Sequence, residues 1–130
     1  MKYVVLIHAN PEPWGHPTSQ FTAEGRAQPP EYHERADREF DQLLEEMSAA
    51  GELVMGEALA DPATSTIYGW APEGALATDG PYAETKEQLA GFFVIDVADR
   101  ARAEKIAAQF AHPGGVVELR PAMWPGGEDQ

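Results

Sequence analysis

The sequence has no cysteine and few basic residues. Its 130 residues include 9 Lys and Arg against 22 Asp and Glu, which gives a formal net charge of −13. The absence of cysteine excludes a disulfide framework, a zinc ribbon and a thiolate nucleophile. The negative charge repels phosphate backbones and anionic lipid surfaces, so we expect no nucleic-acid partner and no membrane partner.

Long hydrophobic runs are also missing. The opening MKYVVLIHA is apolar over only about seven residues, against the roughly 18 that a membrane span needs, and no signal-peptide cleavage box follows it. We therefore expect a cytoplasmic protein. The length and the hydrophobic share of 43% favour one packed domain over residues 1–121. The Pro- and Gly-containing residues 122–130 are predicted to be a mobile tail.

Hydrophobic periodicity predicts a mixture of helices and strands. The β-branched run at 2–8 predicts a strand buried on both faces, and the five prolines and two glycines of residues 9–30 predict a long loop. Apolar residues with helical spacing predict a helix from 31 to Gly51, and Asp99 is the predicted N-cap of a second helix. The remaining apolar segments predict strands at 52–59, 64–70, 75–78, 89–98 and 116–120.

This order of elements is typical of an α+β fold. Two helices on one face of a largely antiparallel sheet leave the other face uncovered, and a small domain must shield that face with a ligand or a partner. A homodimer of ferredoxin-like sandwiches satisfies this requirement.

Four segments carry a resemblance to a known family: MKYVVLIH, GELVMGEAL, TDGPYAETKEQLAGFFVIDVAD and GGVVELRP. Together they resemble the YCII-related family, in particular its DGPF branch, although Tyr82 stands where the motif usually has Phe. The resemblance implies a dimeric α/β barrel of two ferredoxin-like protomers. It implies no established reaction, because most members are uncharacterised bacterial proteins. Some look linked to lyase or dehalogenase-type chemistry, and DGPF members are often associated with extracytoplasmic-function sigma factors.

Four residues are candidates for acid and base catalysis: Asp79, Tyr82, Glu57 and His8. Asp79 precedes Gly-Pro, so its carboxylate either abstracts a proton beside the cleft or accepts backbone N–H groups of the turn. Glu57 lies on the apolar face of its strand, where it either pairs with Lys86 or Arg120 or acts as an acid. Tyr82 adds a phenol that donates to a ligand or is simply solvated. His8 ends the first strand as a catalytic or a structural histidine.

Three further residues are candidates for substrate binding. Lys86 either clamps an anionic substrate or balances the acidic residues beside it. His33 lies on the apolar side of its helix and faces either the cleft or a structural partner. If the Pro-rich segment folds over the cleft, Trp14, His16 and Phe21 line a pocket, and otherwise the segment is a surface loop or a dimer contact.

The four histidines lack metal-ligand spacing, and the Gly-Gly pairs lack the strand and helix of a nucleotide loop. We therefore predict neither a metal site nor a cofactor. The first hypothesis is a cofactor-independent lyase, isomerase or cyclase that acts on a small molecule in a cleft associated with the dimer. The alternative is a non-catalytic module that binds a small ligand or regulates a partner such as a sigma factor.

Overall fold

The computed structural model describes residues 1–82 and 87–123. The helical elements are η1 (Thr18–Gln20), α1 (Ala23–Arg26), α2 (Pro30–Ala49), η2 (Pro62–Thr64) and α3 (Arg100–Gln109). The strands are β1 (Lys2–Ala9), β2 (Leu53–Ala58), β3 (Thr66–Gly69), β4 (Leu76–Asp79), β5 (Gln88–Asp96) and β6 (Gly115–Pro121).

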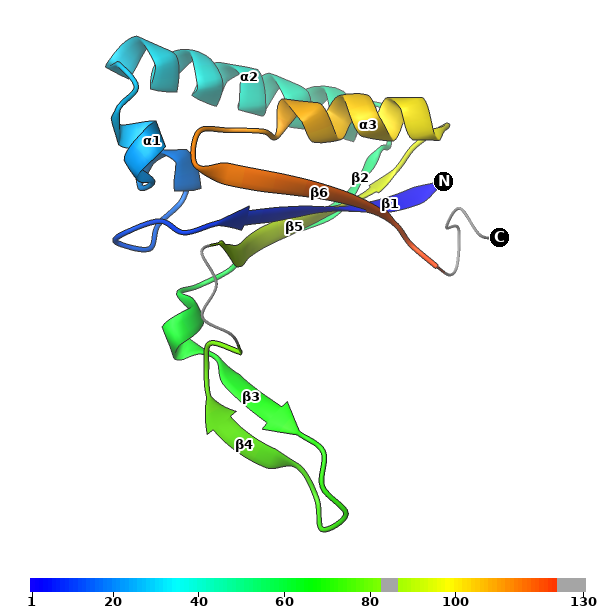
Figure 1. Cartoon of the computed structure of the whole chain (residues 1–130). Coiled ribbons are helices and arrows are strands. Elements are labelled where there is room, and N and C mark those ends of the chain that lie inside the picture. The colour runs from blue at the N-terminus through cyan, green and yellow to red at the C-terminus, as the bar shows by residue number, and fades with distance from the viewer. Residues whose placement is uncertain (83–86, 124–130) are drawn as a thin grey trace.

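The main sheet has four strands in the order β2-β5-β1-β6, and every neighbouring pair is antiparallel. Helices α2 and α3 lie on one face of it (Figure 1). This is the α+β, ferredoxin-like arrangement that the sequence predicts. Among the described residues, no helix is long and apolar enough to cross a membrane.

Local sequence signals set the helix ends. Helix α2 begins at Pro30, whose fixed φ suits the first helical position, and Gly51 follows the helix with a φ of 71°. The Asp99 carboxylate accepts a 2.8 Å hydrogen bond from the backbone N–H of Arg102, which confirms the predicted N-cap of α3.

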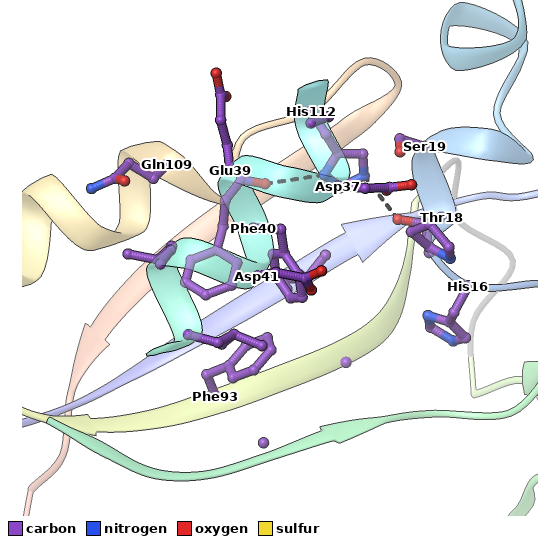
Figure 2. Close-up of a pocket in the computed structure, with 18 of the residues that line it drawn as sticks. His16, Thr18, Ser19, Asp37, Glu39, Phe40, Asp41, Phe93, Gln109 and His112 are labelled. Atoms are coloured by element: carbon purple, nitrogen blue, oxygen red, sulfur yellow. Dashed lines mark hydrogen bonds between the residues drawn. The ribbon is translucent and has the colours of Figure 1, made fainter. Parts of the chain in front are cut away.

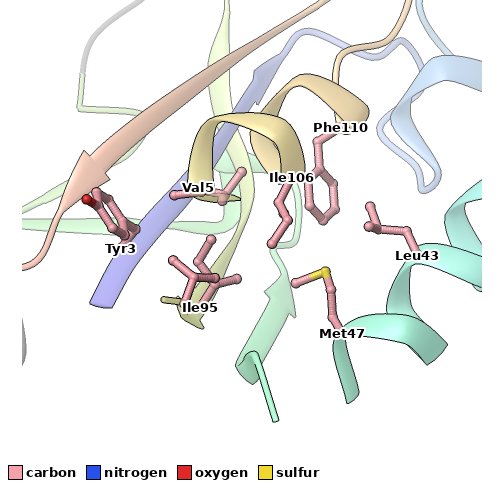
Figure 3. Close-up of a cluster of buried hydrophobic side chains, with 9 residues drawn as sticks. Tyr3, Val5, Leu43, Met47, Ile95, Ile106 and Phe110 are labelled. Carbon is pink, nitrogen blue, oxygen red and sulfur yellow. The ribbon is translucent and has the colours of Figure 1, made fainter. Parts of the chain in front are cut away.

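The hydrophobic core lies between the helices and the sheet (Figure 3). Tyr3 and Val5 of β1 and Ile95 of β5 are fully buried there, against Met47 of α2 and Ile106 of α3. A partly buried ion pair between Glu52 and Arg102 joins the residue before β2 to α3. Strand β1 is thus buried on the helix side as predicted, whereas its other face is only half-covered.

We call the second face of the sheet, away from the helices, the open face. The strand registers place two rows of residues across it. Val4 pairs with Val94 and with Arg120, and Val94 pairs with Met55. The adjacent row is Glu57, Phe92, Leu6 and Glu118. The centre of the open face is therefore apolar, and charged residues occupy its two edges.

Strands β3 and β4 form a separate hairpin, which we call the arm. It projects from the sheet on the side opposite the helices (Figure 1). Its large side chains are exposed, with 69% of Tyr68 and 85% of Trp70 accessible to solvent. An isolated two-stranded hairpin is marginally stable in water, so an additional contact on the arm would stabilise it.

Candidate functional site

A cavity of about 1000 Å³ lies between α2, the sheet and the segment that carries η1. Its apolar wall is a cluster of three aromatic rings from α2, β5 and the end of α3 (Figure 2). The ring centroid of Phe93 lies 6.2 Å from that of Phe40 and 4.7 Å from that of Phe110. A glycine makes room for this cluster, because a Cβ atom on Gly56 would lie 2.5 Å from the Phe93 ring.

His16 lines this cavity, and a backbone carbonyl fixes the tautomer of its ring. The Leu59 carbonyl accepts a 2.9 Å hydrogen bond from Trp14 Nε1 and lies 2.9 Å from His16 Nε2. Since a carbonyl oxygen only accepts, the hydrogen of the neutral ring is on Nε2. His16 Nδ1 then keeps its lone pair, the form of imidazole that accepts a proton.

His112 lines the cavity beside Thr18, and both of its ring nitrogens have partners. Nδ1 lies 3.1 Å from the Phe110 carbonyl, so Nδ1 carries the hydrogen of the neutral ring. Nε2 lies 2.9 Å from the Thr18 hydroxyl, which therefore donates to it (Figure 2). A Cβ atom on Gly115 would lie 2.2 Å from His112 Nε2, so only glycine leaves space for this ring. Both ring nitrogens of His112 are thus occupied by hydrogen bonds within the protein.

Acidic residues of α2 form the polar wall of the cavity. Asp37 and Asp41 are one helical turn apart, and their carboxylates point toward the side where Thr18 and His16 lie (Figure 2). Arg35 also lines the cavity, but it pairs with Glu39 at 3.9 Å and lies over the Tyr32 ring.

Of the residues predicted as catalytic, His8 lies on the open face at the end of β1. Its Nε2 lies 3.4 Å from a Glu118 carboxylate oxygen, and Arg120 donates to the other oxygen of that carboxylate. The hydrogen bond from Arg120 is the main cause that holds the pKa of Glu118 below its ordinary value, and His8 adds to it. His8, Glu118 and Arg120 therefore form one polar group at the β6 edge.

Glu57 lies at the opposite edge, on β2, where it is exposed. Phe92 and Leu6 separate it from Glu118 along the row. The protomer therefore does not bring Glu57 and His8 together. Because the strand is at the edge of the sheet, the Glu57 carboxylate stays in water and needs no buried partner.

Asp79 and Tyr82 lie at the base of the arm. Asp79 pairs with Thr66 at the end of the hairpin, and its side chain hydrogen-bonds to no residue in the described part of the chain. Tyr82 is 86% exposed. Lys86, the predicted substrate clamp, lies outside the described residues.

Trp14 and His33 lie in the N-terminal half of the chain. The Trp14 indole adjoins His16, with ring centroids 6.3 Å apart, and it also borders a smaller hollow of about 200 Å³ beside Pro81 and Gln88. His33 Nε2 lies 2.9 Å from the Gly25 carbonyl, a contact that joins α2 to α1. The segment at 9–30 thus folds against the body and supplies His16 to the cavity.

Sequence reasoning did not single out His112, Asp37 and Asp41 as functional residues. His112 stands in a His-Pro-Gly-Gly run that marks the end of a helix, and its contact with Thr18 spans 94 residues of chain. Asp37 and Asp41 have the four-residue spacing that puts two carboxylates on one side of a helix. This spacing is the one feature of the sequence that could have indicated a site at Asp37 and Asp41. It is a weak indication, because charged residues on a helix surface are usually in contact with solvent alone.

The sequence pattern of the YCII-related domain matches residues 1–123. The chain belongs to the YCII-related family. An uncharacterised protein of Rhizobium meliloti (strain 1021) is 36% identical over 103 residues, which cover 75% of this chain and 82% of that relative. The name of this relative states no reaction. In the described part of this YCII-related domain, no three His, Asp or Glu side chains are close enough to hold a metal ion.

Proposed function

We propose that this YCII-related protein is a cofactor-independent enzyme that moves a proton on a small molecule bound in the cavity under α2. The reaction is of the lyase, isomerase or cyclase type. The observation that supports it is the exposed His16 ring in the lining of this cavity, whose Nε2–H is directed to the Leu59 carbonyl so that Nδ1 keeps its lone pair.

The proposed step transfers one proton to His16 and back to the substrate, with no oxidation or reduction. His16 Nδ1 takes a proton from an acidic C–H, N–H or O–H group of the substrate, and the electron pair of that bond stays on the substrate. The resulting imidazolium keeps its bond to Leu59, and the carboxylates of Asp37 and Asp41 stabilise its positive charge. The proton then returns to another substrate atom in an isomerisation or cyclisation, or to the leaving group in an elimination.

We also propose that the protein is a homodimer and that its open faces pack together as a dimeric α/β barrel. The apolar centre of the open face, with Val4, Leu6 and Phe92, supports this association, as does the family. Sheets that pack face to face lie about 10 Å apart, so the exposed arm of each copy would extend alongside its partner. The DGPY motif supports membership of the DGPF branch of the family.

A cleft between the two open faces is a second candidate location for the reaction. The hydrogen-bonded group of His8 and Glu118 supports it, because a partner would cover these side chains and exclude water from them. In this version His8 is the acid or base, and Glu57, Asp79 and Tyr82 of either copy complete the cleft.

The non-catalytic alternative is a ligand-binding or regulatory module of the cytoplasm, associated with an extracytoplasmic-function sigma factor. The net charge of −13 supports it, since an acidic surface complements a basic partner.

Two matched variants separate these alternatives. Mixtures of small metabolites in D2O are incubated with the protein, and NMR records which C–H positions exchange or which compounds convert. We expect His16→Gln to lose this activity, because glutamine still donates to Leu59 but provides no base, while His8→Gln keeps it. Activity lost only in His8→Gln would place the reaction on the open face. If no compound exchanges or converts with the wild-type protein while a sigma factor co-purifies with it, the regulatory alternative replaces the enzyme.

A further inference from the structure

We infer that the ligand of the cavity under α2 is a small organic ammonium ion with an aromatic or other apolar body. This inference rests on the proposed function, since it names the substrate class for the same cavity.

Most polar groups available to a ligand on the Thr18 side of the cavity offer acceptors, and the Ser19 hydroxyl there can both donate and accept. His16 directs its only N–H to Leu59, which leaves the Nδ1 lone pair. The Thr18 hydroxyl donates its hydrogen to His112 Nε2, so its oxygen offers only lone pairs to another partner. The carboxylates of Asp37 and Asp41 also accept. A ligand that satisfies these groups must carry several hydrogen-bond donors, and a primary ammonium carries three.

The charge of the cavity lining favours the same class. Four carboxylate residues of α2 and a single guanidinium, that of Arg35, line the helix side of the cavity. The guanidinium already lies over the Tyr32 ring at 5.6 Å from its centroid and pairs with Glu39. A carboxylate or phosphate ligand would therefore meet repulsion without a free cation among the described lining residues, whereas an ammonium would be attracted.

The aromatic wall accounts for the apolar part of the ligand. Phe40, Phe93 and Phe110 form a continuous ring cluster at one side of the cavity, and 38% of Phe40 is exposed. Such a wall buries an apolar body, and the negative faces of the rings also attract a nearby cation. The volume of about 1000 Å³ accommodates a ligand of drug-like size or smaller.

Three probes of one shape test the ligand class: 2-phenylethylammonium, 2-phenylethanol and 3-phenylpropionate. Their dissociation constants are measured at pH 7 and low salt by calorimetry and by protein-observed NMR, with the His16 and Phe93 signals as reporters of the cavity. We expect the ammonium to bind about tenfold more tightly than the alcohol, and the carboxylate to bind more weakly than both.

A pair of charge-matched variants locates the effect. Asp37→Asn with Asp41→Asn should abolish the preference for the ammonium and leave the affinity for the alcohol unchanged. Glu34→Gln with Glu45→Gln removes the same charge from the same helix at residues that do not line the cavity, and it should keep the preference. Loss of the preference in both double variants would show that net charge alone attracts the ammonium, and would overturn the inference.

The remaining outcomes distinguish the ligand class from the proposed function. Equal binding of alcohol and ammonium with His16 signals shifted would overturn the ammonium class and leave the cavity as a binding site. If none of the three probes shifts the His16 and Phe93 signals, the ammonium class is overturned. The D2O exchange assay, which compares the wild-type protein with His16→Gln, then tests the enzyme proposal independently.

Discussion

Arg102 donates two hydrogen bonds to the two carboxylate oxygens of Glu52, and each bond is 2.8 Å long. This paired geometry fits a planar guanidinium to a carboxylate, and both side chains are partly buried. The hydrogen bonds from Arg102 hold the pKa of Glu52 below its ordinary value of 4.5, and the bonds to Glu52 raise the pKa of Arg102. The pair therefore favours the charged form of Glu52 in the folded protein.

The first prediction concerns acid stability. Because the pKa of Glu52 is lower in the folded state, its contribution is complete above pH 4.5 and is lost as the pH falls below 4.5 through the folded pKa. We expect Glu52→Gln to lower the free energy of unfolding at pH 7 by about 1–2 kcal/mol, and the difference from wild type to vanish in acid. Urea unfolding between pH 7 and pH 3 measures this.

The exposed ion pair of Arg100 and Glu104 on α3 provides the control. Glu104→Gln should change the free energy of unfolding at pH 7 by less than about 0.5 kcal/mol, because solvent screens such a pair. If Glu52→Gln and Glu104→Gln lower the free energy of unfolding equally, the partly buried pair of Glu52 and Arg102 is no more stabilising than an exposed pair.

The second prediction concerns the hydrogen bond between Thr18 and His112. Thr18→Val keeps the shape of the side chain but leaves His112 Nε2 without its donor, so we expect a loss of about 1–3 kcal/mol in the free energy of unfolding. Thr18→Ser keeps the hydroxyl and should retain more stability than Thr18→Val. Denaturant midpoints of the two variants check this order, and the reverse order would show that the methyl group matters more than the hydrogen bond.

The third prediction concerns Gly115. An alanine there would press its Cβ against the His112 ring, which two hydrogen bonds hold in place, so Gly115→Ala should destabilise the protein by about 1–3 kcal/mol. Gly69→Ala is the matched control, since a Cβ on Gly69 would meet no atom within 4 Å. Thermal unfolding of both variants measures the difference, and equal melting temperatures would contradict the close packing at Gly115.

The fourth prediction concerns the proposed homodimer. Light scattering of the wild-type protein should give twice the chain mass of 14.2 kDa. Leu6→Asp places a charge at the apolar centre of the open face and should yield monomers. Ser48→Asp adds the same charge on α2, at the helix side of the sheet, and should leave the dimer intact. A wild-type mass of 14.2 kDa at micromolar concentration would refute the dimer.

Much of the fold was predictable because the signals are local. The apolar spacing of α2 and the Asp99 cap of α3 depend on residues that are close in the sequence, and the structure confirms both. The environment of Glu57 was not predictable in this way, because the alternation of its strand does not reveal that β2 is at the edge of the sheet.

The cavity was predictable only in part. The sequence suggested that Trp14 and His16 line a pocket if the Pro-rich segment folds over, but their hydrogen bonds go to Leu59, more than 40 residues away. The same holds for Thr18 and His112, which meet only in the folded chain. Hydrophobic periodicity reports which face of an element is buried, and it carries no information on which distant polar groups meet.

The arm interrupts a connection between strands that are already adjacent. β2 and β5 pair with each other, and the Leu59 N–H donates a 2.8 Å hydrogen bond to the Ala90 carbonyl just beyond the end of β2. The arm is therefore topologically an insertion in a β-hairpin, and the four-stranded sheet does not depend on its length. We expect a chain in which a short turn replaces the arm to keep the strand order and the helix layer, because β3 and β4 pair only with each other in the described chain.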